Sequence, residues 1–247
     1  MPIDATIPPW PKQLSPRDFS DPQLVAPTLD APAPLSGAPQ TVMSGSGRWT
    51  MQMSYIPVFT DPATGRDNLA IWRALFTGRL QLGLPVLLPA RDWRRGPVQR
   101  GSLAVDPALV PFSDTATFSD TTEFSSDYED VKLTNAASVG DTSIMVDVDA
   151  AVAAAGGTPT GGDFISISQR LYLIVGAFPV DGVSNRFTWN VMPPLRFAAD
   201  AGEIAEIRNP VCVMRLSTES RRAIAAQRDL GALARVSLTF VEDNWTI

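Results

Sequence analysis

The chain has 247 residues, carries a formal net charge of −6 and contains no histidine. This charge argues against specific binding of nucleic acid, which needs a basic face, and the lack of histidine excludes Ser-His-Asp and Cys-His nucleophiles and histidine-bearing zinc sites. No apolar run approaches the roughly 18 residues of a membrane span, so no membrane insertion is expected.

Residues 1–39 are rich in proline, which interrupts every periodic pattern. Because proline also disfavours helix in the preceding residue, we predict an extended arm that lies on this protein or on a neighbour. Three spaced apolar side chains, Trp10, Phe19 and Leu29, are its candidate anchors. We expect the arm to become ordered only against a neighbouring subunit or another protein.

Regular structure is predicted from Gln40, where residues 40–45 and 47–58 read as two β segments separated by a glycine-rich turn. In the second segment, Trp49, Met51 and Met53 alternate with polar residues. One face of this strand is therefore predicted to be apolar.

Residues 69–80 form the clearest helical pattern in the chain. Their apolar stripe must be buried against a sheet, and it consists of Leu69, Trp72, Leu75, Phe76 and Leu80. Asp67 or Asn68 is the candidate N-cap, and Gly83 is placed to end the helix. Residues 85–93 then return as a strand. Downstream, Arg91, Arg94, Arg95 and Arg100 form a basic cluster that we interpret as a solvated turn.

Residues 111–130 contain three related segments that begin at Phe112, Phe118 and Phe124. Their Ser, Thr and Asp content predicts an ordered but irregular loop. Its carboxylates could act as an acid–base pair or bind calcium, and they are Asp114, Asp120, Glu123, Asp127, Glu129 and Asp130. No EF-hand spacing is present, so a solvated acidic loop is favoured. We assign no catalytic residue, metal ligand or cofactor to the chain and expect no enzymatic activity.

Residues 131–208 are predicted to form a second unit of short strands, a small barrel or sandwich. Strands are expected over 142–148, with Ile144, Val146 and Val148 on one face, and over 163–175 as a pair joined at residues 168–170. Further strands are expected over 185–197 and 202–209, and Trp189 is assigned to the core. The glycine-rich stretch 155–162 lacks the ending of a phosphate-binding loop.

The last part of the chain begins with a strand around Cys212, whose thiol is predicted to be buried. Residues 217–231 fit either a helix capped by Ser217 or Thr218 or a distorted strand pair, and residues 235–242 fit a final strand. The glycosylation-like triplet 244–246 is interpreted as a chance match. Because β segments flank the second unit on both sides, we predict one discontinuous domain of residues 40–110 and 209–247, interrupted by an insertion over 131–208.

The succession of several segments resembles minor tail proteins of long-tailed phages, most closely the distal tail class at the junction of tail tube and tip. The resemblance covers residues 35–243 and rests on the segments 36–55, 69–89, 112–124, 162–175, 191–197 and 235–243. It implies a mainly β protein with a tail-tube-like β-sandwich, one flanking helix and an additional small β domain. The insertion of that second domain departs from the better-known pattern, in which it is C-terminal.

The resemblance further implies a non-enzymatic virion protein that forms a ring around the DNA exit channel, with a hexamer favoured and a trimer as the alternative. Its expected partners are the tail tube protein, the tip hub protein and the tape measure protein. The expected location is the tip of the virion tail, after synthesis in the bacterial host cytoplasm. An acidic channel wall would repel DNA phosphates. The alternative function is a carbohydrate-binding tail module that contacts the host surface through residues 131–208, with Trp189 as its test residue.

Overall fold

The computed structural model describes residues 7–14, 16, 18–26, 28–30, 41–43, 47–54, 56, 68–90, 131–148, 158–183, 185–207, 209–226 and 237–243. The described chain is mainly β, in agreement with the prediction. It forms two compact units, one from the described residues up to Ala90 and from Val211 onward, the other from the described residues between them. The loop predicted over residues 111–130, with its three related segments, lies outside the described residues.

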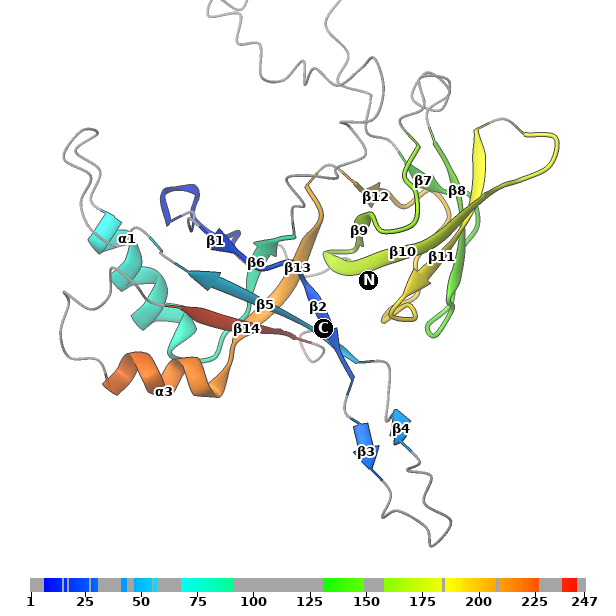
Figure 1. Cartoon of the computed structure of the whole chain (residues 1–247). Helices are drawn as coiled ribbons and strands as arrows, with labels where there is room; N and C mark the ends of the chain where they lie inside the picture. The colour runs from blue at the N-terminus through cyan, green and yellow to red at the C-terminus, as the bar shows by residue number, and fades with distance from the viewer. Residues whose placement is uncertain are drawn as a thin grey trace, which may run out of the picture. The chain divides into compact units, whose positions relative to one another are not determined.

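The first unit is built on a six-stranded sheet with the order β1-β5-β14-β13-β6, in which β2 also pairs with β5 (Figure 1). Its strands are β1 (Asp18–Phe19), β2 (Gln23–Val25), β5 (Arg48–Ser54), β6 (Val86–Pro89), β13 (Val211–Leu216) and β14 (Leu238–Glu242). The strand pairs in this sheet are antiparallel. The central strands β5 and β14 therefore come from opposite ends of the chain.

One face of this sheet is apolar. The predicted alternation of β5 is confirmed, because Trp49, Met51 and Met53 are buried while the residues between them are at least partly exposed. Met51 pairs with Phe240 of β14, which is also fully buried. Cys212 of β13 lies on the same side and is buried, as expected for a structural thiol.

The N-terminal segment packs on the sheet of its own chain. Pro9 forms a parallel bridge with Leu87 of β6, and the amide of Trp10 donates to the Leu87 carbonyl over 2.9 Å. The short 3₁₀ helix η1 (Lys12–Leu14) follows, and the Trp10 indole donates to the Leu14 carbonyl. The Trp10 ring meets Phe240 edge-on at 5.7 Å.

This packing corrects the expectation that the arm becomes ordered only against a neighbour. Residues 7–14, β1 and β2 find their partners in β5, β6 and β14 of the same unit. The physical reason is that their extended backbone completes the hydrogen bonds of the sheet edges. A separate two-stranded pair, β3 (Thr28–Asp30) and β4 (Thr41–Met43), follows; the side chains of Phe19 and Leu29 lie outside what the structure describes.

The predicted helix over residues 69–80 is present as α1 (Asn68–Leu75), continued by a π-helical turn, η2 (Phe76–Leu80). Trp72 is buried and stacks on Phe76, with ring centroids 5.6 Å apart. Asn68 is the first helical residue, and its buried side-chain oxygen accepts no hydrogen bond, so it is not the predicted cap. Asp67 lies outside the described residues.

Residues 218–226 decide between the helix and the distorted strand pair that the sequence allowed for this segment. They form α3 (Thr218–Ala226), so the helix interpretation is confirmed there and the distorted strand pair is wrong. The amide of Ser220 donates to the Ser217 hydroxyl over 3.1 Å, which makes Ser217 the N-cap. Ser220 in turn accepts a hydrogen bond from the Thr239 amide and so ties α3 to β14.

The second unit is a six-stranded antiparallel sheet with the order β12-β9-β10-β11-β8-β7. Its strands are β7 (Lys132–Leu133), β8 (Ser143–Asp147), β9 (Phe164–Ile167), β10 (Arg170–Pro179), β11 (Arg186–Met192) and β12 (Ala205–Glu206). Its first and last strands meet: Lys132 bridges Ile204, and the Ala205 amide donates to the Val131 carbonyl. The sheet therefore closes almost completely into a small barrel.

Apolar side chains fill this barrel. The predicted inward set of β8 is confirmed, because Ile144, Val146 and Val148 are all buried, and Trp189 is completely buried among them. The predicted tight connection at residues 168–170 is also present. Ser168 and Gln169 both have positive φ values, the conformation that matches the twist of a two-residue hairpin.

Candidate functional site

The candidate site is a hollow on the outer surface of the barrel, beside β8. It has a volume of about 200 Å³ and opens to solvent. Its lining residues are Asn135, Ala136, Ala137, Asp141, Ser143, Ile144, Met145 and Thr188. Carboxylate, amide and hydroxyl groups therefore surround a small apolar floor.

Two strands and one loop position these side chains. Met145 of β8 pairs with Thr188 of β11, and side chains at paired positions point to the same face of a sheet. The loop that follows β7 is held by hydrogen bonds from the Thr134 amide to the Met145 carbonyl and from the Ser138 amide to the Asp141 carboxylate. The rim of the hollow is thus fixed by backbone contacts on both sides.

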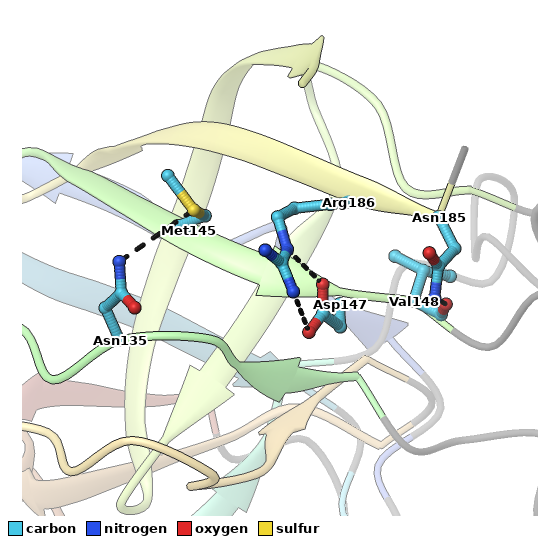
Figure 2. A network of polar contacts seen from close by, with 6 residues as sticks. All are labelled: Asn135, Met145, Asp147, Val148, Asn185 and Arg186. Atoms are coloured by element: carbon cyan, nitrogen blue, oxygen red, sulfur yellow. Dashed lines mark hydrogen bonds and ion pairs between the residues drawn. The ribbon is translucent and has the colours of Figure 1, made fainter. Parts of the chain in front are cut away.

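The Asn135 amide is the polar group most available to a ligand. Figure 2 shows it pointing from the loop toward Met145, where its Nδ2 lies 3.9 Å from the thioether sulfur. Sulfur is a weak acceptor, so exchange of this contact for a hydrogen bond to a ligand oxygen costs little. Ser143 and Asn135 are both exposed.

An ion pair is formed by Asp147, which lies two residues along β8 from Met145 of the hollow. The Arg186 guanidinium donates to both carboxylate oxygens of Asp147, at 2.7 and 3.0 Å (Figure 2). These hydrogen bonds lower the pKa of Asp147 below its ordinary value, partly opposed by desolvation, and the same contact raises the pKa of Arg186. Asn185 donates to the Val148 carbonyl beside them. Arg186 is therefore occupied by its own carboxylate partner.

An aromatic side chain lies across Thr188 from the hollow. Phe178 of β10 pairs with Thr188 and is 55% exposed. The β10–β11 register shifts between Ile174 and Gly176, which makes Val175 an extra residue in β10. Without this bulge the alternation would put Phe178 on the inner face with Ile174, so the bulge turns Phe178 outward.

Most residues that the sequence offered for chemistry lie outside the described part of the chain. The six loop carboxylates, Asp114, Asp120, Glu123, Asp127, Glu129 and Asp130, lie outside the described residues, as do Arg91, Arg94, Arg95, Arg100 and the triplet 244–246. Within the described ranges, no group of three or more Cys, Asp or Glu side chains could hold a metal ion. No helix among the described residues is long and apolar enough to cross a membrane.

Two further functional candidates from the sequence are ruled out, one by the burial of its side chain and the other by the element that follows it. Trp189 is 0% exposed, so it cannot be the sugar-binding residue of the alternative function, because its ring faces the barrel core. At the end of the glycine-rich stretch, Thr160 and Asp163 form a turn in which the Asp163 carboxylate accepts a hydrogen bond from the Thr160 amide. The strand β9 follows this turn, whereas a phosphate-binding loop is followed by a helix.

Sequence reasoning missed the hollow and Phe178. The alternation of β8 did indicate that Ser143 and Met145 lie on its outer face. Gly176 inside a strand was the one available signal of a bulge, since an interior strand glycine often marks one. Nothing in the sequence indicated that the loop of residues 135–141 would enclose that face.

Comparison of the chain with protein-family models found no match, and comparison with curated proteins found none either.

Proposed function

We propose that this chain is a structural, non-enzymatic subunit of the tail tip of a long-tailed phage. In this role it forms a ring that joins the tail tube to the tip hub around the DNA exit channel. The proposed neighbours are the tail tube, hub and tape measure proteins, and the proposed location is the virion tail. A hexamer is favoured over a trimer.

One observation carries the proposal: the order of the elements. An antiparallel sheet flanked by α1 and α3 is assembled from both ends of the chain, and a closed β unit interrupts it in the sequence (Figure 1). The resemblance implies a tail-tube-like β-sandwich with one flanking helix and an added small β domain, and the helix-flanked sheet with its separate β unit agrees with this in broad outline. The agreement supports the proposal because it covers two separate units rather than one strand pattern, whereas the inserted position of the second unit departs from the better-known pattern.

Electron microscopy of the purified full-length protein tests this function directly. At high protein concentration we expect closed rings of uniform size, since most homo-oligomers close with point-group symmetry. Native mass measurement gives the number of copies, and antibody labelling of phage particles should mark the tail tip. A protein that stays monomeric at high concentration and is absent from particles would rule the proposal out.

A further inference from the structure

We propose that the first unit binds residues 111–130 of a second copy of the chain, on a surface at the end of η2. This surface consists of Arg79, Leu82, Leu84 and Arg221 and is named the leucine–arginine surface. The choice of a second copy rests on the proposed ring, whereas the match between the surface and the segment does not.

The end of η2 leaves two leucines exposed. Leu82 and Leu84 lie on either side of Gly83, and they are 67% and 42% exposed. The amides of Gly83 and Leu84 donate back to carbonyls of the last turn, in the two hydrogen bonds of a Schellman motif. In this motif the residue after the glycine usually packs on an apolar side chain of the last turn, but Gly78 and Arg79 occupy those positions. Leu84 therefore lacks its usual apolar partner.

Two arginines flank the leucines. The Arg79 Nε donates to the Pro85 carbonyl over 2.6 Å. Arg221 of α3 lies over Gly83, where an added Cβ would be 2.8 Å from its Nη1. The Arg221 Nη2 donates to the Thr218 hydroxyl, and its Nε is buried without a hydrogen-bond partner. Among the residues that the structure describes, no carboxylate pairs with either arginine, so both charges are available to an anionic partner.

The composition of residues 111–130 is complementary to this surface. The segment contains Phe112, Phe118 and Phe124 together with six carboxylates, and it has no lysine or arginine. Its charge of −6 equals the net charge of the whole chain, because the other 20 carboxylates are balanced by the 20 Lys and Arg side chains. This segment is therefore the strongly acidic and aromatic part of the chain, which suits exposed leucines beside unpaired arginines.

The spacing within the segment also fits. Phe112 and Phe118 are each followed by an aspartate two residues later. In an extended chain such side chains point to the same side, roughly 7 Å apart. A phenylalanine ring packed on either leucine would therefore bring its aspartate toward Arg221, which lies over the glycine between them. A guanidinium can bind such a carboxylate through two parallel hydrogen bonds.

A labelled synthetic peptide of residues 111–130, titrated with the full-length protein, tests this match. Fluorescence anisotropy should show saturable binding that weakens at high salt, since part of the attraction is between charges. Leu82→Ser should raise the dissociation constant about tenfold, because a leucine buried on binding is lost. Val25→Ser is the matched control, since it removes another exposed aliphatic side chain of the first unit, from β2, and should leave binding unchanged.

Peptide variants leave the protein intact and so separate binding from folding. A peptide in which Phe112, Phe118 and Phe124 are replaced by alanine should bind at least about tenfold more weakly. A scrambled peptide of the same composition, which breaks the phenylalanine–aspartate spacing, should also bind more weakly. Equal binding of the scrambled peptide would show attraction by charge alone and would overturn the inference, as would no saturable binding or no effect of Leu82→Ser.

Analytical ultracentrifugation of the full-length protein tests whether the segment comes from a second copy. Self-association should require about tenfold more protein when Phe112, Phe118 and Phe124 are replaced by serine, and an excess of free peptide should also dissociate the copies. Self-association unchanged by both treatments would overturn the contact between copies. Rings seen by microscopy together with a peptide that does not bind would refute this contact and leave the proposed tail function standing.

Discussion

At the scale of single residues, close backbone packing decides which glycines are required. Gly161 lies in the turn before β9, and a Cβ there would be 2.8 Å from the carbonyl oxygen of Val175. The neighbouring Gly162 amide donates to the Ile174 carbonyl over 2.7 Å. Gly161 and Gly162 thus pack against β10 at its bulge, a structural role in place of the phosphate site that the composition of the stretch suggested.

Gly161→Ala is therefore expected to destabilise the barrel by about 1–3 kcal/mol, the usual cost of forcing an added methyl group against packed atoms. Gly78→Ala is the matched control, since no atom lies within 4 Å of a Cβ at that helical position. It should leave stability unchanged or raise it by about 0.5–1 kcal/mol. Urea unfolding of both variants measures the difference, and equal stability of the two would contradict the packing argument.

The Asp147–Arg186 pair predicts a pH dependence. Because the folded protein lowers the pKa of Asp147, the pair stabilises the fold above the unfolded pKa and loses this contribution as pH falls through the lower folded value. The effect should be small, since both side chains are about one-third exposed. Asp147→Asn should be less stable than the parent protein near neutral pH, and the difference should shrink below about pH 4. A difference that stays constant into acid would show that the ion pair is not its source.

At the scale of elements, the N-terminal segment covers an edge of the first sheet. Pro9 and Trp10 lie along β6, and Ile7, Trp10 and Leu14 are buried. Proline suits this position because it offers no amide for further strand pairing. The segment that the sequence suggested as an arm lying on this protein or on a neighbour is part of the core of its own unit.

Deletion of residues 1–14 should therefore destabilise the first unit by several kcal/mol, at about 1.5–3 kcal/mol for each buried side chain lost. It should also promote aggregation, because the β6 edge becomes open for pairing. Deletion of residues 1–6 is the control, since it keeps every contact described for this segment. Chemical unfolding and light scattering provide the two readouts, and a stable, monodisperse 1–14 deletion would contradict the assignment.

The helix α1 has a buried side and an exposed side at adjacent positions. Trp72 is 3% exposed and stacks on Phe76, whereas Arg73 is exposed. Trp72→Ala should cost about 3–5 kcal/mol, a large share of the roughly 5–15 kcal/mol that stabilises a domain. Arg73→Ala should change folding little and affect only contacts between subunits. Thermal unfolding compares the two variants. If Arg73→Ala destabilised the fold and Trp72→Ala did not, the buried face of α1 would have been assigned wrongly.

At the scale of the whole molecule, two compact units with separate cores predict two unfolding transitions. Trp189 is completely buried in the barrel, and Trp72 is buried in the first unit. Trp189→Ala should lower the free energy of unfolding of the barrel by about 3–5 kcal/mol, while Trp72→Ala lowers that of the first unit. Calorimetry with hydrogen exchange assigns each transition, and a single transition shifted equally by both variants would show that the units unfold together.

The pattern of side chains along the sequence is enough to predict the local elements and the fold class. Alternation identified the buried faces of β5 and β8, and helical spacing identified α1, because hydrophobic periodicity directly reports which side of an element faces a core. The tight turn at Ser168 and Gln169 was also predictable from two adjoining strand patterns. No residue of the candidate hollow was predicted as a site.

The way in which distant segments meet is a property of the tertiary fold. The pairing of Pro9 with Leu87, the closure of the barrel from Lys132 to Ile204, and the loop of residues 135–141 over β8 all join backbone edges that are remote in sequence. Any extended segment offers the same amides and carbonyls, so the pattern of side chains cannot specify these partners. The bulge at Val175 likewise depends on how β10 pairs with β11. A single extra residue reverses the faces of the rest of β10, and it turned Phe178 from a core side chain into an exposed one.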